Sequence, residues 1–233
     1  MSLPLRVRYY GEDKPLPAQT PLRAGPLHLV YEAGDLRYIR LGEREIVRRI
    51  YVAVRDQNWG TALRDVQMDI ADDHFDIRYT VENRMNEIDF IWQGVITGER
   101  DGTIRFRMDG QARSTFLRNR LGFCVLHPLV CAGRPARIEH VDGTVEQSVF
   151  PVQIAPQLVI DGQIKPVAPF AEMAALAYEV EPGLWAELRF EGDIFEMEDQ
   201  RNWTDASFKT YSTPLGLPFP VTVQPGDAVR QAI

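Results

Sequence analysis

The amino-acid sequence predicts an all-β fold, an antiparallel β-sandwich or barrel with little helix. Apolar residues recur with a period of two, turn dipeptides separate the alternating runs, and the 233 residues include 17 glycines and 16 prolines. A period of two places one face of each strand against a core and the other towards solvent. Short runs bounded by tight turns are typical of antiparallel sheets.

The alternation predicts strands in chain order. Residues 104–109 (IRFRMD) show it most strictly, because Ile104, Phe106 and Met108 fall on one face. The other runs are 27–31, 36–41, 75–81, 88–97 and 184–190, with further strands expected at 50–54 and 194–197. The turn dipeptides are Gly34-Asp35, Asp101-Gly102, Asp142-Gly143, Asp161-Gly162 and Gly192-Asp193.

Three segments are less regular. Residues 170–178 (FAEMAALAY) are rich in good helix formers and predict a short helix, with a buried strand running into Val180 as the alternative. Residues 14–26 contain four prolines and predict an ordered crossing segment or an N-terminal arm. The residues from Val229 onward look like the opening of a strand. We therefore expect the native polypeptide to continue past Ile233; the alternative is a strand that frays at a true terminus.

Composition excludes several classes of function. The net charge of −7 argues against nucleic acid as a partner, and no apolar run approaches the roughly 18 residues of a membrane span. Cys124 and Cys131 lie in one apolar stretch and are expected to be buried free thiols in a reducing cytosol. The length fits a single domain spanning residues 1–233 of a cytoplasmic protein.

The densest polar segment, residues 196–211, follows a predicted core strand. Its carboxylates could act as general acids or bases, its cations could hold an oxyanion, and its indole suits the apolar face of a sugar ring. The candidate side chains are Glu198, Asp199, Arg201, Asn202, Trp203, Asp205 and Lys209. We interpret the segment as part of a site; the alternative is a solvated loop with Asx turns and incidental ion pairs.

Two further segments carry candidate residues. Residues 55–62 (RDQNWGTA), with Asn58 and Trp59, echo the first segment, so the two loops either converge on one pocket or are similar by chance. Residues 118–129 contain Arg120 and also His127, which precedes Pro128 and is either a general acid or base or a satisfied core residue. The histidines have no metal-ligand spacing, so neither a metal nor another cofactor is expected.

These segments carry a family resemblance. FEMEDQRNWTDASFKTYSTPLGLPFPV (195–221), RRIYVAVRDQNWGT (48–61) and RLGFCVLHPL (120–129) resemble the N-terminal region of D-apionate lactonase-like proteins, bacterial enzymes of branched-sugar catabolism. The resemblance extends over essentially the whole chain. It implies a supersandwich similar to that of galactose mutarotase, followed in the full-length protein by a TIM-barrel domain and a small β domain. It leaves open whether catalysis resides in these residues or in the barrel.

The resulting hypothesis is hydrolysis of a five-membered sugar lactone to the open aldonate. In it Glu198 or Asp199 activates water, and Arg201 and Lys209 stabilise the oxyanion or hold the product carboxylate. Trp59, Trp203, Asn58 and Asn202 would shape the sugar pocket, with Asp205 and Arg120 as further substrate contacts.

Two other functions stay open. The first is a stand-alone aldose mutarotase or epimerase, in which His127 loosely matches a mutarotase histidine and Glu198 would be the base. The second histidine of that chemistry has no clear counterpart and would have to be His140 or a substitute. The second is a non-catalytic module that binds carbohydrate or packs against the barrel.

Overall fold

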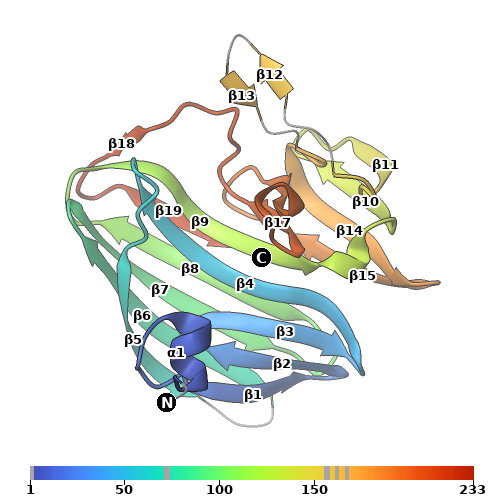
Figure 1. Cartoon of the computed structure of the whole chain (residues 1–233), viewed down its shortest axis with the longest axis horizontal. Helices are drawn as coiled ribbons and strands as arrows, with labels where there is room; N and C mark the ends of the chain where they lie inside the picture. Colours follow the sequence, from blue (N-terminus) through green and yellow to red (C-terminus); the bar gives the residue numbers. More distant parts are fainter. Residues whose placement is uncertain (1–2, 71–73, 155–157, 161–162, 166–167) are drawn as a thin grey trace.

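The computed structural model describes residues 3–70, 74–154, 158–160, 163–165 and 168–233. Its largest sheet has eight strands in the spatial order β1-β2-β3-β4-β9-β17-β16, and β18 also pairs with β9. The strands are β1 Gln19–Ala24, β2 Leu27–Glu32, β3 Asp35–Leu41, β4 Arg44–Asp56, β9 Phe116–Pro128, β16 Glu196–Asp199, β17 Ser207–Tyr211 and β18 Val221–Val223. The long strands β4 and β9 lie side by side through the middle of the molecule (Figure 1).

A second sheet of five strands, in the order β19-β8-β7-β6-β5, stacks against the first. Its strands are β5 Leu63–Ile70, β6 Phe75–Met85, β7 Ile88–Gly98, β8 Ile104–Ala112 and β19 Ala228–Ala232. The strict alternation predicted for β8 is observed, since Phe106 and Met108 are fully buried. The strand expected from Val229 onward is also confirmed, because β19 pairs antiparallel with β8.

A third sheet has the order β11-β10-β14-β15, and a short hairpin pairs β12 with β13. These strands are β10 Pro135–His140, β11 Val145–Val149, β12 Leu158–Ile160, β13 Gln163–Lys165, β14 Met173–Glu181 and β15 Leu184–Arg189. The helix predicted at 170–178 is wrong, and the strand alternative is correct. Although its residues favour a helix, β14 is paired on both sides and buries Leu176 and Tyr178, so tertiary pairing overrides propensity.

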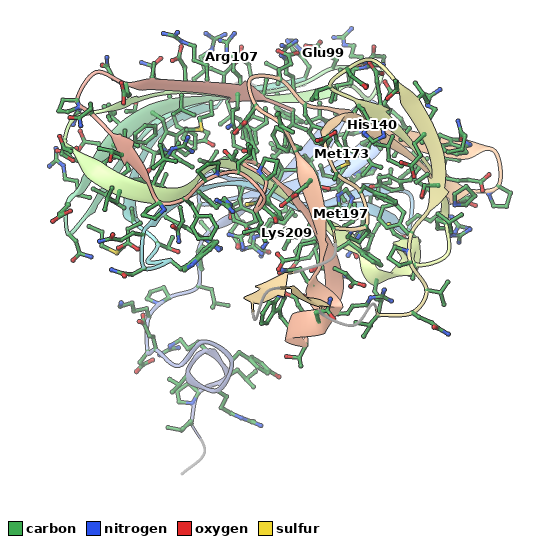
Figure 2. The ribbon with its side chains drawn as sticks, turned by 90° about the horizontal axis from the view of Figure 1, so that it is seen from above. Glu99, Arg107, His140, Met173, Met197 and Lys209 are labelled. Atoms are coloured by element: carbon green, nitrogen blue, oxygen red, sulfur yellow. The ribbon has the colours of Figure 1, made fainter. Side chains whose placement is uncertain are left out.

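Helix is limited to short pieces in the described part of the chain: α1 Leu5–Tyr10 and the 3-10 turns η1 Leu129–Cys131 and η2 Gln200–Trp203. The sequence reasoning did not predict α1, which stands clear of the sheets when the molecule is viewed from above (Figure 2). Residues 14–26 form an ordered segment in which β1 pairs with β2. Four of the five predicted turn dipeptides separate consecutive strands; Asp161-Gly162 lies outside the described residues.

The core lies between the sheets and confirms the all-β sandwich. Its largest fully buried side chains come from all three main sheets and include Trp92, Tyr31, Tyr178, Phe90, Phe106 and Phe123. Each such apolar side chain contributes about 1.5–3 kcal/mol when it leaves water. Alternate residues of β4, β9 and β17 enter this core, so the residues between them project from the opposite face of the eight-stranded sheet. We call that opposite side the outer face.

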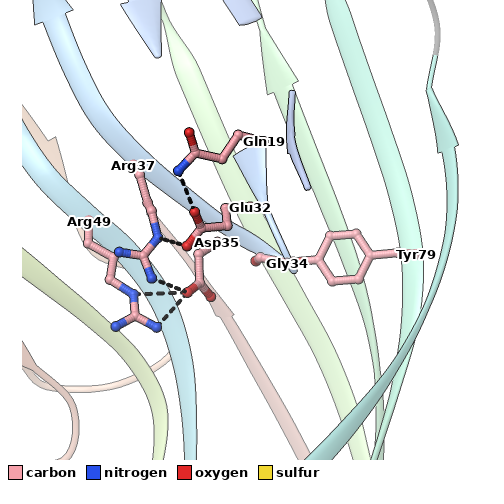
Figure 3. A network of polar contacts seen from close by, with 7 residues as sticks. All are labelled: Gln19, Glu32, Gly34, Asp35, Arg37, Arg49 and Tyr79. Atoms are coloured by element: carbon pink, nitrogen blue, oxygen red, sulfur yellow. Dashed lines mark hydrogen bonds and ion pairs between the residues drawn. The ribbon is translucent and has the colours of Figure 1, made fainter. Parts of the chain in front are cut away.

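An ionic network ties the first four strands of this sheet together (Figure 3). Buried Asp35 accepts a hydrogen bond of 2.9 Å from Arg49 Nε, while Arg37 pairs with Glu32 at 2.6 Å. The hydroxyl of Tyr79 in β6 donates to the carbonyl of Gly34 at 2.8 Å, which joins the five-stranded sheet to the same turn. The network holds β4 in place, and β4 forms part of the site described next.

Candidate functional site

A pocket of about 430 Å³ opens on the outer face of the eight-stranded sheet. It is lined by Ala53, Arg55, Trp59, Arg120, Cys124, Glu198, Gln200, Trp203, Lys209, Tyr211, Ser212 and Leu215. Its floor is hollow because the central strands carry small side chains there, Ala53 on β4 and Cys124 on β9. The cross-strand partner of Ala53 is Gly122, where a Cβ would lie 2.3 Å from Ser212 Oγ. Close packing beneath the pocket therefore requires glycine at this position.

Strand register brings the polar groups of the pocket together. Lys209 on β17 pairs with Glu198 on β16, and Arg120 on β9 pairs with Arg55 on β4. Directly paired residues project from the same face with their Cβ atoms about 5 Å apart. Figure 2 shows Lys209 on the side of the eight-stranded sheet and Arg107 of β8 on the opposite side of the sandwich. The pocket thus collects two cross-strand pairs of charged residues on one face.

Glu198 is held by three donors. Its Oε2 accepts from Lys209 Nζ at 2.7 Å and from Gln200 Nε2 at 2.8 Å, and its Oε1 accepts from Trp203 Nε1 at 2.7 Å. A carboxylate oxygen has two lone pairs, so Oε1 keeps one for a further donor. Glu198 is therefore oriented by its neighbours and still able to accept a proton or a hydrogen bond.

Two tryptophans from separate loops border the pocket. Trp203 belongs to η2, and Trp59 lies in the loop after β4, so of the two alternatives for these similar loops the structure shows convergence on one pocket. Asp56 holds the second loop by accepting from the backbone N–H of Asn58 at 2.9 Å and of Gly60 at 2.7 Å. Both indoles are strongly exposed. Exposed indoles beside hydrogen-bonding groups can pack on the apolar face of a sugar ring.

Arg120 is unusual because it is only 5% exposed and incompletely paired. Its Nη1 donates to the carbonyl of Asn119 at 2.6 Å, whereas its Nε and Nη2 have no hydrogen-bond partner. The Nε of Arg55 also lacks a partner. Burial lowers the pKa of Arg120 from its usual value, with opposing contributions from Tyr211 and Glu196. The guanidinium lies beneath the rings of Trp59 and Phe219, at 5.6 and 5.0 Å from their centroids.

The thiol and the phenol on the floor are held in their neutral forms. Burial raises the pKa of Cys124, and burial together with the hydrogen bond to Glu196 raises the pKa of Tyr211. The Tyr211 hydroxyl donates to Glu196 at 2.6 Å. Cys124 and Cys131 are both buried free thiols, as the sequence predicted. A protonated thiol is a weak nucleophile, so Cys124 contributes to the shape of the pocket.

Asp199 and Arg201 do not line the pocket. Asp199 is buried, caps η2 through the backbone N–H of Arg201, and forms a two-pronged ion pair with the same arginine. Arg201 also donates to the carbonyls of Pro151 and Val152, both at 2.9 Å, and lies over the ring of Phe208. The ion pair of Asp199 and Arg201 therefore anchors η2, because its donors and acceptors are all used within the protein.

His127 lies on the inner face of β9, away from the pocket. It is fully buried; its Nε2 is 2.9 Å from Thr210 Oγ1 and its Nδ1 is 3.4 Å from the Tyr178 hydroxyl. Burial lowers its pKa to about 3, so the imidazole is neutral at pH 7. His127 is therefore a satisfied core histidine, which was the alternative to a general acid or base. His140, in contrast, is in the four-stranded sheet and contacts the carbonyl of Ala171 at 3.0 Å.

The remaining predicted residues lie outside the lining. Asn58 is exposed and takes part in its loop through its backbone, Asn202 is half-buried in η2, and exposed Asp205 accepts from Ser207 Oγ at 3.1 Å. The sequence reasoning missed Arg55, Gln200, Tyr211, Ser212 and Leu215 as lining residues. The period of two in β4 and β17 could have identified Arg55 and Tyr211, because they share a face with Ala53 and Lys209.

Beyond this pocket, the described residues form a second hollow, but neither a cluster placed to hold a metal ion nor a helix able to span a membrane. A hollow of about 560 Å³ lies near the C-terminal Ile233, and none of the predicted site residues is among its described lining residues. Within the part of the chain that the structure describes, no group of three or more His, Cys, Asp or Glu side chains is placed to hold a metal ion. No helix in that part is long and apolar enough to cross a bilayer.

Comparison with known proteins adds sequence and fold relatives. Residues 7–233 match the family model of the D-apionate lactonase N-terminal domain. A D-apionate lactonase from Brucella anthropi is 38% identical over 229 residues, which cover 96% of this chain and 36% of that protein. The chain thus spans little more than a third of this relative's length.

Among solved structures, the fold resembles one titled "Putative aldose 1-epimerase" from Escherichia coli K12, with a TM-score of 0.57 and 12% identity. The likeness covers 92% of this chain and 97% of that one. At this identity the likeness concerns the fold alone, and it agrees with the sandwich expected from the sequence.

Proposed function

The chain belongs to the D-apionate lactonase N-terminal domain family, and from this premise we propose that its outer-face pocket binds a sugar lactone and takes part in opening it to the aldonate. The Brucella anthropi relative is named for that class of product. The pocket on this chain combines a carboxylate, cations and two indoles, which are the groups that a polar ring with an electrophilic carbonyl would contact.

The proposed reaction uses water alone as co-reactant. The water oxygen bonds to the lactone carbonyl carbon while Glu198 accepts the proton that the water loses. The bond from that carbon to the ring oxygen then breaks, and the ring oxygen takes the proton back from Glu198 to become a hydroxyl. The new carboxyl group loses its remaining proton to solvent. The products are a free hydroxyl and a carboxylate, so Lys209 lies next to developing negative charge at the carbonyl oxygen.

The observation that carries this proposal is the environment of Glu198. Three donors orient its carboxylate at the pocket wall, one Oε1 lone pair stays available, and Trp203 contributes both a hydrogen bond and an aromatic surface. Asp199 is a weaker candidate for the base because both its oxygens are engaged by Arg201. In the proposal, Glu198 is therefore the base and Arg201 supports η2.

A proton NMR time course of the 233-residue chain with the lactone of D-apionate tests this function. We expect opening above the buffer rate, reduced by Glu198→Gln about a hundredfold, because the amide cannot accept the proton. Glu146→Gln, an exposed glutamate on β11, serves as the matched control and should open the lactone at the wild-type rate. Near-normal turnover by Glu198→Gln would refute Glu198 as the base.

Absence of turnover by the whole chain would refute catalysis within these residues. The chemistry would then belong to the part of the longer protein that this chain does not span, which we propose includes a TIM-barrel domain. Retained lactone or aldonate binding would identify the chain as the carbohydrate-binding module of that protein. The buried free thiols support a reducing cytoplasm as the proposed location.

A second candidate function is aldose mutarotation, which the fold likeness favours. His127 cannot reach the pocket from the inner face of β9, so Glu198 would have to act on the sugar in this case as well. Polarimetry of a freshly dissolved aldose with the chain distinguishes the two functions. Faster anomerisation without lactone opening would favour the mutarotase.

A further inference from the structure

Two donors of Arg120 are buried without a partner, and they lie on the same edge of its guanidinium. Nη1 is used by the carbonyl of Asn119, which leaves Nε and Nη2 as the unused pair. These two N–H groups point in parallel from the side of the planar group and match the two oxygens of a carboxylate. A buried donor without a partner destabilises a fold. Two such donors on one side chain therefore indicate an acceptor supplied by a ligand rather than a contribution to stability.

The lining of the pocket around Arg120 carries more cations than carboxylates. Arg55 is its direct cross-strand partner, and like charges opposite each other destabilise a sheet. In the pocket lining, Arg55, Arg120 and Lys209 face one carboxylate, Glu198, which already pairs with Lys209. Among the described residues, no ion pair engages either arginine. This local excess of cations contrasts with the net charge of −7 on the whole chain.

We propose that Arg120, with Arg55 beside it, is the carboxylate-binding site of the pocket and holds the acid group of the open aldonate. The proposal rests on the proposed function for the identity of the sugar acid, whereas the anion site itself rests on the two arginines. It assigns to Arg120 the role that sequence reasoning gave to Arg201 and Lys209.

Access to the two donors is controlled by side chains. Trp59 and Phe219 contact each other edge-to-face, with centroids 6.2 Å apart, above the guanidinium. They are 44% and 45% exposed and come from separate loops. In the proposal, rotation of these two exposed rings uncovers Nε and Nη2, and the strands keep their places. The aldonate carboxylate then enters beside the rings, with its carbon chain directed along the pocket towards Glu198.

Isothermal titration calorimetry of the whole chain tests the assignment with three probes: D-apionate, its neutral lactone and inorganic phosphate. We expect D-apionate to bind more tightly than the other two. Arg120→Met and Arg120→Lys should each raise its Kd about tenfold or more, because neither side chain offers two parallel donors. Arg107→Met removes the same charge from an exposed arginine on the opposite side of the sandwich and should leave the Kd within about twofold.

The outcomes separate this proposal from the proposed function. Binding of D-apionate that depends on Arg120, without lactone turnover, would support the anion site and refute catalysis by this chain. Turnover by the chain, with an unchanged Kd in Arg120→Met, would support catalysis by these residues and refute Arg120 as the anion site. Failure of the wild type to bind D-apionate, or tighter binding of phosphate, would overturn the carboxylate assignment.

Thermal unfolding distinguishes a ligand-binding role of Arg120 from a merely structural one. Arg120→Met should melt at the wild-type temperature or above it without ligand, since methionine leaves no unpaired donor in the pocket. D-apionate should raise the melting temperature of the wild type and not that of Arg120→Met. A lower melting temperature of the ligand-free variant, with its ligand-induced rise intact, would contradict the proposal.

Discussion

Arg49 and Arg55 lie on the same strand and the same outer face, yet their surroundings differ. Arg49 donates to buried Asp35 and stacks over the Tyr51 ring at 4.1 Å, within the network of Figure 3. Arg55 faces Arg120 across the strands, and each has an Nε without a partner. Arg49 therefore belongs to a network of ion pairs, whereas no ion pair among the described residues engages Arg55.

This contrast separates structural from functional charge in the eight-stranded sheet. Around Asp35 the protein supplies both the cations and the acceptors, so the network stabilises the fold without any ligand. Around Arg120, no carboxylate among the described residues forms an ion pair with either Arg55 or Arg120. The same logic applies to the two faces of β9, because His127 on the inner face is fully satisfied and Arg120 on the outer face is not.

The largest expected effect is on stability, from Asp35→Ala. Removal of this buried carboxylate leaves Arg37 and Arg49 without their shared acceptor and should lower the free energy of unfolding by about 3 kcal/mol. Urea denaturation measures the change. Asp109→Ala, which breaks an exposed ion pair with Arg230, is the matched control and should cost less than about 1 kcal/mol. Equal losses in the two variants would contradict the distinction drawn for the Asp35 network.

The next effect is a pH dependence from His127. Its folded-state pKa of about 3 lies below the ordinary value of 6.5, so only the unfolded chain gains a proton as the pH falls through 6.5. This contribution to stability is complete above pH 6.5 and is lost progressively between pH 6.5 and 3. Between pH 7 and pH 5 the loss should be about 2 kcal/mol.

Urea denaturation at the two pH values checks this prediction. His127→Gln should lose less stability than the wild type over that interval, because glutamine does not titrate. Exposed His28→Gln should behave as the wild type does. An equal pH dependence in wild type and His127→Gln would show that the buried imidazole is not the cause.

The smallest effect compares the two arginines of β4 directly. Arg49→Met removes the main donor to buried Asp35 and should cost about 1.5 kcal/mol, whereas Arg55→Met should change the free energy of unfolding by less than about 0.5 kcal/mol. Both variants remove the same charge from the same face of the same strand. A cost for Arg55→Met as large as that for Arg49→Met would indicate that Arg55 also has a structural role.

Much of the site could be predicted from chain order and residue type. The two Asn-Trp loops each follow a strand, and their similarity suggested either one shared pocket or chance; the structure places Trp59 and Trp203 at one pocket. Glu198 and Lys209 were predicted because they fall among polar residues next to a core strand. Asp199 and Arg201 carry the same charges as Glu198 and Lys209 and lie in the same segment. Local sequence therefore could not distinguish a residue of the pocket wall from an anchor of η2.

The all-β class follows from the sequence alone, because a period of two needs only local alternation between apolar and polar residues. Tertiary structure decided which face of each strand meets the core, and so placed His127 inside and Arg120 outside on the same strand. It also decided that residues 170–178 form a strand, since pairing with two neighbours outweighs helix propensity. The unpaired edge of Arg120 appears only after all its neighbours are in place, because hydrogen-bond satisfaction depends on residues distant in the chain.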